Sequence, residues 1–187
     1  MGLVQVATET ITSAVSTQSI LGVTTDDVYL LTYHNLFMTD DGRVPNIRFT
    51  KSSDNSADSS SNYDQAFINM YTGQSFYKSG NVNGTNFSNN STGTTILESQ
   101  VGMMYLYNFN NSSEYSFMAQ EGINITETPE ITSMTKGGVL TVAQSCNGVQ
   151  FVANAGTIKS GTFTLYRCVW YEWIWIPTRS TRTKFWK

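Results

Sequence analysis

Residues 103–120 read MMYLYNFNNSSEYSFMAQ, and this stretch indicates how the chain folds. Tyr105, Tyr107 and Phe109 recur at every second position, which predicts that they share one face of an extended strand. The Asn and Ser residues that follow favour a turn, and the alternation resumes around Phe117. The stretch therefore predicts a β-hairpin with aromatic side chains on one face.

The same two-residue period recurs along much of the chain. Residues 28–37 are β-branched or aromatic on both faces, which is typical of a strand buried on both sides. Ile47 and Phe49 alternate with polar residues, as in a strand with one wet face, and 162–166 alternates likewise. Residues 63–71 fit a short helix or a strand, and we favour the strand. About seven to nine short strands without a long helix predict an all-β protein, an antiparallel β-sandwich or jelly roll.

A second hairpin is predicted near the end of this sheet-forming region. Asn147 and Gly148 favour positive φ at both central positions of a tight type I′ turn. The turn would join strands at 139–146 and 149–153, and it would point Cys146 inward.

Composition divides the chain into three parts. Residues 1–22 have no helical period and are expected to be an extended N-terminal arm that adds an edge strand or contacts a neighbouring subunit. Residues 23–166 form the β-sandwich domain, in which the polar stretches 52–62 and 79–95 are expected to be surface loops. Residues 167–187 form a basic, Trp-rich C-terminal extension.

Charge is low and unevenly distributed. Charged residues make up 13% of the chain, against roughly 25% in soluble domains. Residues 1–166 hold 6 basic and 13 acidic side chains, and 167–187 hold 5 basic and 1 acidic. Because nucleic-acid binding needs a basic footprint, we expect no nucleic-acid partner for the body. We also expect no membrane contact, since no apolar stretch approaches the roughly 18 residues of a span and no basic signal-peptide region precedes Arg43.

Side chains that carry chemistry are few. With a single histidine, His34, the chain cannot build a triad or a His-rich metal site, so we interpret it as a hydrogen-bonded sheet residue. Cys146 and Cys168 have opposite alternation, which predicts two free thiols and no disulfide.

Carboxylates offer two further possibilities. A glycosidase would need a facing pair, but Asp40 and Asp41 lie in a predicted turn, and Asp54, Asp58 and Asp64 lie in or beside a polar loop. The Asp54-to-Asp58 spacing resembles part of a calcium loop but lacks its glycine and terminal glutamate. We expect no catalytic residue, no metal ion and no cofactor.

Tryptophans are confined to the end of the chain. Aromatic residues and arginine are enriched at interface centres, because they bring large area and a polar group at low entropic cost. The stretch 170–176 is apolar on both faces of a further strand, which could pack on its own domain or on another subunit. We favour a subunit interface, with the following residues in it: Trp170, Tyr171, Trp173, Trp175, Arg179, Arg182 and Trp186.

Several short motifs suggest a family. They are Asp27-Val28-Tyr29, Leu106-Tyr107-Asn108-Phe109-Asn110-Asn111 with Glu114-Tyr115-Ser116, Gly138-Val139-Leu140-Thr141, Cys146-Asn147-Gly148-Val149 and Gly161-Thr162-Phe163-Thr164-Leu165-Tyr166. Together they resemble small structural proteins of marine tailed bacteriophages, over residues 22–166 with gaps at the polar loops. Those proteins usually end soon after the last motif, whereas this chain continues through Arg167 to Lys187.

The resemblance implies a non-enzymatic jelly-roll subunit of the virion, either a capsid decoration or cement protein or part of the tail or fibre. Its partners would be other copies of itself, a trimer being one form, and the major capsid or tail proteins. The alternative is a host-surface adhesin that binds a glycan through loops 52–62 and 79–95. Tyr63, Tyr71 and Phe76 would then form the aromatic platform. An enzyme acting on host glycans is the third hypothesis.

Overall fold

Two antiparallel sheets make up the protein in the computed structural model, which describes residues 2–72, 76–126 and 130–169. In chain order the elements are β1 Gly2–Thr10, β2 Thr17–Leu21, β3 Tyr29–Met38, β4 Pro45–Lys51, β5 Tyr63–Tyr71, β6 Tyr77–Gly84, the short 3-10 helix η1 Ile96–Glu98, β7 Gln100–Tyr107, β8 Ser116–Ile125, β9 Ile131–Leu140, β10 Cys146–Ala153 and β11 Ile158–Val169. The large sheet has the order β1-β11-β3-β7-β8-β9-β5-β6, and the small sheet has the order β2-β10-β4. The predicted all-β, sandwich-like fold is thus confirmed.

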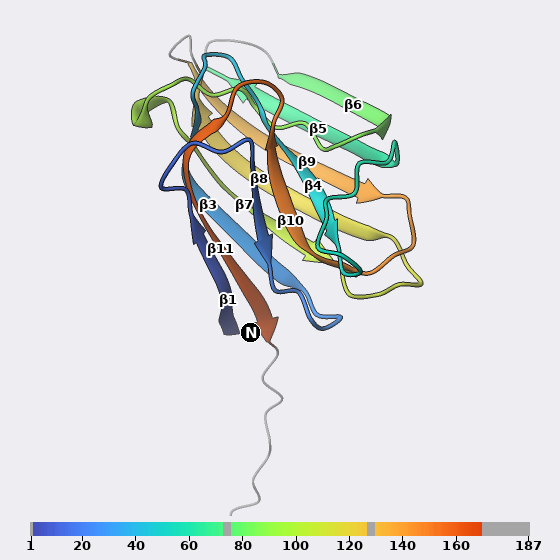
Figure 1. Ribbon diagram of the computed structural model, residues 1–187. Helices are drawn as coiled ribbons and strands as arrows, with labels where there is room; N and C mark the ends of the chain where they lie inside the picture. Colours follow the sequence, from blue (N-terminus) through green and yellow to red (C-terminus); the bar gives the residue numbers. More distant parts are fainter. Residues whose placement is uncertain (1, 73–75, 127–129, 170–187) are drawn as a thin grey trace, which may run out of the picture.

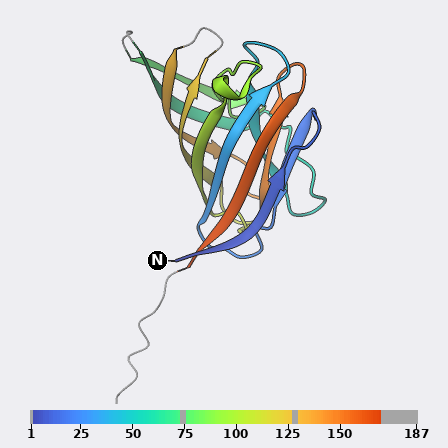
Figure 2. The ribbon, with the colours of Figure 1, turned by 90° about the vertical axis from the view of Figure 1, so that its left-hand side faces the viewer.

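The small sheet packs on one face of the large one, as the two views of the ribbon show (Figures 1 and 2). We call this face of the large sheet the inner face and the opposite face the outer face. None of the described residues belongs to a helix long and apolar enough to cross a membrane.

The hairpin predicted from residues 103–120 is present as β7 and β8. Tyr107 pairs with Phe117 and Tyr105 with Ala119, so the aromatic face forms as expected. Phe109 departs from the prediction, because Asn108 has a φ of 58° and reverses the alternation. Phe109 is therefore buried in the core instead of joining Tyr107.

Strand β3 is buried along most of its length, as predicted for residues 28–37. Its alternation is interrupted at Asn35, where φ is 55° and the register with β7 shifts. Because of this irregularity Tyr33 and Leu36 both lie in the core, and His34 between them is exposed. The ambiguous segment 63–71 is a strand, β5.

Strand β10 continues through Asn147 and Gly148, with a shift in its register against β4, so the predicted turn between 139–146 and 149–153 was wrong. Gly148 pairs with Leu21 on one side and Thr50 on the other, and the backbone of Ile20 approaches where a Cβ would be. Asn147 accepts a hydrogen bond from Thr50 Oγ1 at 2.7 Å. The glycine therefore permits close approach of two neighbouring strands and does not form a turn.

Residues at the N-terminus are part of the folded body. β1 forms one edge of the large sheet, beside β11, and β2 forms one edge of the small sheet. Ile11 and Ile20 lie in the core, so residues 2–22 pack on their own chain. At the other end, β11 continues past the expected boundary at 166 to Val169.

Aromatic rings fill the space between the sheets. Phe49 of the small sheet lies 4.4 Å from Phe109 and 5.0 Å from Phe87, measured between ring centroids. Phe151 lies 5.4 Å from Tyr33 in an edge-to-face arrangement, which favours the ring quadrupoles. These contacts fix the small sheet on the inner face.

The segment 85–95 covers the part of the inner face that carries polar side chains. The sequence predicted a surface loop over 79–95, but 77–84 is strand β6, and Phe87, Asn89 and Thr92 are buried. This correction has a physical reason: the amide groups of Asn89 and Asn90 hydrogen-bond to Gln100 and Asn124 of the sheet below, which offsets the cost of burying them.

Candidate interaction surface

The outer face of the large sheet carries exposed apolar side chains. They alternate with the buried residues of β5, β7, β8 and β9 and are Ile68, Met70, Val101, Met103, Phe117, Ile123 and Ile131. Ile123 is 50% exposed and Phe117 42%. Single exposed apolar residues are ordinary on proteins, but a group on neighbouring strands marks an interaction surface.

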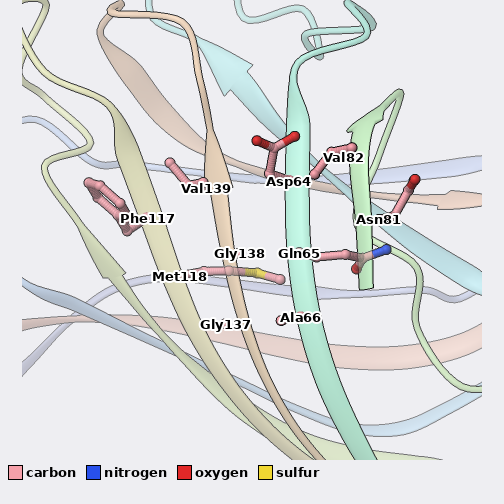
Figure 3. Close-up of a pocket in the computed structure, with 10 residues that line it drawn as sticks. All are labelled: Asp64, Gln65, Ala66, Asn81, Val82, Phe117, Met118, Gly137, Gly138 and Val139. Carbon is pink, nitrogen blue, oxygen red and sulfur yellow. The ribbon is translucent and has the colours of Figure 1, made fainter. Parts of the chain in front are cut away.

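A first groove on this face has a volume of about 480 Å³ and is lined by β5, β6, β8 and β9 (Figure 3). Phe117 and Val139 are cross-strand partners beside it, and Asp64 faces Val139 from β5. Gly137 lies in the groove with no heavy atom within 4 Å of the position a Cβ would take. An incoming side chain would therefore meet open space at this point.

A second groove, of about 600 Å³, lies farther along the sheet and is lined by β3, β5, β7, β8 and β9. Met70, Val101, Met103 and Ile123 give it apolar walls, and Glu121 adds a carboxylate. A smaller hollow of about 220 Å³ adjoins it and shares Met103 and Glu121. The outer face thus combines apolar grooves with the negative charges of Asp64 and Glu121.

The inner face contains a buried polar cluster around Lys136. Burial lowers the pKa of the Lys136 ammonium to about 7, and its Nζ donates a hydrogen bond to the Ser88 carbonyl. Nearby, Gln120 donates to the Tyr33 hydroxyl at 2.9 Å. Burial raises the pKa of Tyr33 to about 12, against the opposing effect of its hydrogen bonds.

Amide side chains extend this cluster. Asn69 donates to Asn90 at 3.0 Å, Asn90 to Asn124 at 3.1 Å, and Asn124 to the Ser91 carbonyl at 2.8 Å. Asn89 donates to Gln100 at 2.8 Å. Each of these hydrogen bonds joins the segment 85–95 to a strand of the large sheet. The cluster therefore holds that segment against the sheet.

The acidic residues of loop 52–62 stabilise turns. Asp54 accepts hydrogen bonds from the Ser56 amide and hydroxyl, which lower its pKa, and it pairs with Lys51 at 3.3 Å. Asp58 accepts from the Ser60 amide and the Gln144 amide group. In the described ranges, no three His, Cys, Asp or Glu side chains lie close enough to hold a metal ion.

The aromatic platform expected for a glycan is not assembled. Tyr63 is fully buried, and its hydroxyl donates to the Asp58 carbonyl at 2.8 Å and accepts from the Phe49 amide at 3.1 Å. It is therefore a core residue. Phe76, by contrast, is exposed just before β6.

The two cysteines are free thiols, as predicted. Cys146 belongs to the core cluster, whereas Cys168 is buried outside it. The residues expected at a subunit interface lie outside the described part of the chain; they are Trp170, Tyr171, Trp173, Trp175, Arg179, Arg182 and Trp186.

Comparisons with protein-family models, with curated proteins and with solved structures find no match to this chain. The outer face was not singled out from the sequence. The sequence feature that indicates it is that both faces of β7 and β8 carry apolar residues. On β7, for example, Val101 and Met103 lie on one face and Met104 and Leu106 on the other.

Proposed function

We propose that the protein is a non-enzymatic structural subunit of a bacteriophage virion, which assembles with its neighbours through the outer face of the large sheet. The observation that carries the proposal is the apolar outer face with its two grooves. Interface centres are enriched in aromatic residues and Met, and this face exposes Phe117, Met70 and Met103. The virion context rests on the resemblance of the sequence motifs.

The strand pairing supports a jelly roll. In this fold a chain of paired strands is wound so that early and late strands become neighbours in two sheets. Here β11 lies between β1 and β3, and β10 lies between β2 and β4. We propose that these strands are the jelly-roll framework and that β8, β9, β5 and β6 widen one of its sheets.

The surface suits a particle in salt water. Ion pairs between exposed groups are screened by salt, whereas hydrogen bonds and apolar burial persist. The described residues contain two ion pairs, and the side chains of both are partly exposed. Cohesion of this protein, and of its contacts with neighbours, depends mainly on apolar packing and amide hydrogen bonds.

Location on the particle provides the test. An antibody raised against loop 52–62, which is largely exposed, would be added to particles of the phage that encodes this chain and viewed by electron microscopy. We expect regular labelling of the head or the tail, which also decides between capsid and tail partners. Absence of the chain from purified particles, by mass spectrometry and by labelling, would refute the virion role.

A further inference from the structure

We infer that the outer face of one copy binds residues 170–187 of a second copy. This inference rests on the proposed function and names the partner of the outer face. Three observations carry it: where the described chain ends, the chemistry of the residues that follow, and the position of the grooves on the sheet.

The described chain ends at Val169, beside Gly2 at one end of the large sheet. At about 3.3 Å per residue, residues 170–187 reach up to about 60 Å. With strands spaced about 4.8 Å apart, an eight-stranded sheet is roughly 34 Å wide. The segment is therefore long enough to cross the outer face of a neighbour.

The chemistry of the two surfaces is complementary. Residues 170–187 contain all four tryptophans of the chain, and the outer face offers grooves walled by Met70, Val101, Met103 and Ile123. A buried aromatic side chain removes about 150–250 Å² from water, which makes these rings strong anchors. The segment also holds four Lys or Arg and one Glu. Its net positive charge suits the carboxylates of Asp64 and Glu121 beside the grooves.

A second copy fits this geometry better than the same chain. The first groove lies over β5, β6, β8 and β9, and the second over β3, β5, β7, β8 and β9, whereas β11 lies on the far side of β3. The second groove lies back along the strands, at the level of Thr32 and its β11 partner Thr164, so to reach it the same chain must reverse direction after Val169. Residues 170–176 contain no Gly, Pro, Asn or Asp, and the first turn-forming residue is Pro177. The sequence therefore predicts that the segment first leads away from its own sheet.

Such a contact joins two different surfaces, the segment of one copy and the face of the next. It closes into a ring when the rotation between copies allows, and a trimer is one such ring. Each copy then has one face filled and one segment docked.

Tryptophan fluorescence tests this directly, because every tryptophan lies in residues 170–187 and the emission reports on that segment alone. In the full chain at high concentration we expect emission at the short wavelength of a buried indole. Dilution should shift it to the long wavelength of a solvated indole, together with a fall in mass by light scattering. Emission that does not change with dilution would overturn binding in trans.

Variants of the face make the test specific. Ile123→Asp and Thr135→Lys both change the second groove, and Thr135→Lys replaces an exposed polar residue, so it leaves the core intact. We expect both to give long-wavelength emission at concentrations where the parent emits at short wavelength. Leu97→Asp is the matched control, because Leu97 is 79% exposed but lies on η1, outside both grooves. It should behave as the parent, and circular dichroism would verify that each variant is folded.

Mixing two defective chains completes the experiment. One carries Thr135→Lys with its tryptophans intact, and the other carries an intact face with all four tryptophans changed to Phe. Docking in trans predicts that the mixture regains short-wavelength emission, because the first chain's segment finds the second chain's face. No recovery would refute the inference. The proposed function fails separately, if the chain is absent from particles, whatever the fluorescence shows.

Discussion

Lys136 is buried at 2% exposure among polar side chains, and it makes the stability of the protein depend on pH. An unfolded lysine has a pKa near 10.4, and burial lowers that of Lys136 to about 7. Between these values the unfolded state binds more protons than the folded state, so the free energy of unfolding rises with pH, by up to about 1.4 kcal/mol per pH unit. Below pH 7 both states are protonated and this dependence ends.

Cys146 acts in the opposite direction at higher pH, because burial raises its pKa to about 11, so the unfolded thiol loses its proton first. The rise in the free energy of unfolding caused by Lys136 is therefore clearest between about pH 7 and 8.5. Urea unfolding of the parent across this window should show rising stability, and Lys136→Met should remove the rise. An unchanged slope in Lys136→Met would contradict the assignment.

Tyr63 connects the core to loop 52–62 through its hydroxyl. In Tyr63→Phe the Phe49 amide and the Asp58 carbonyl both lose a buried partner. We expect a loss of about 1–3 kcal/mol in the free energy of unfolding, measured by urea titration. Tyr115→Phe removes a hydroxyl from a side chain that is 46% exposed, and it should change stability by less than about 0.5 kcal/mol. Equal effects of the two substitutions would argue against the buried hydrogen bonds.

At the scale of single elements, β9 contains two adjacent glycines with opposite roles. A Cβ on Gly138 would lie 2.6 Å from Phe87 Cε1, in the packed core, whereas a Cβ on Gly137 has no neighbour within 4 Å. Gly138→Ala should therefore destabilise the protein by about 1–3 kcal/mol. Gly137→Ala should be neutral or stabilise it by up to roughly 1 kcal/mol, because it reduces the entropy of the unfolded chain. Thermal unfolding of the two variants measures both changes in stability. A larger loss of stability in Gly137→Ala than in Gly138→Ala would contradict the inward direction of Gly138.

Period-two alternation was enough to predict most strands, including β4, β5, β7 and β8. The predictions failed at asparagine and glycine residues, because these residues can occur either in a turn or within a strand. Asn35 and Asn108 take positive φ within or just after strands and so redirect the next side chain. Gly148 permits close strand approach instead of a turn. Local residue chemistry allows each of these outcomes, and only the pairing of distant strands selects among them.

At the scale of the whole molecule, the sequence could not show which sheet face a second layer covers. Val101 and Met103 are apolar and alternate as core residues do, yet they lie on the outer face. Conversely, the polar segment 85–95 looked like a loop and is packed on the inner face, where Asn69, Asn124 and Lys136 meet it. The candidate surface and the polar cluster both depend on contacts between residues far apart in the chain, which composition does not encode.

Salt should have little effect on the folded chain. Lys51 pairs with Asp54 at 3.3 Å and Arg167 with Asp27 at 3.9 Å, and solvent reaches the side chains of both pairs. Raising the salt concentration from about 0.1 M to about 1 M shortens the Debye length from about 10 Å to about 3 Å. We expect the free energy of unfolding to fall by less than about 1 kcal/mol, measured by thermal unfolding in sodium chloride. A larger loss would show that ion pairs hold the fold together.

The position of the last two strands determines when the chain can fold. β11 lies between β1 and β3, and β10 lies between β2 and β4, so each sheet has a gap until the C-terminal strands are synthesised. While the ribosome is still making the chain, β1 and β2 lack the strands with which they pair. Such distant pairings give a high contact order and slow folding. Residues 170–187 follow both strands in the chain, so a contact made by that segment can form only after β10 and β11 have been synthesised.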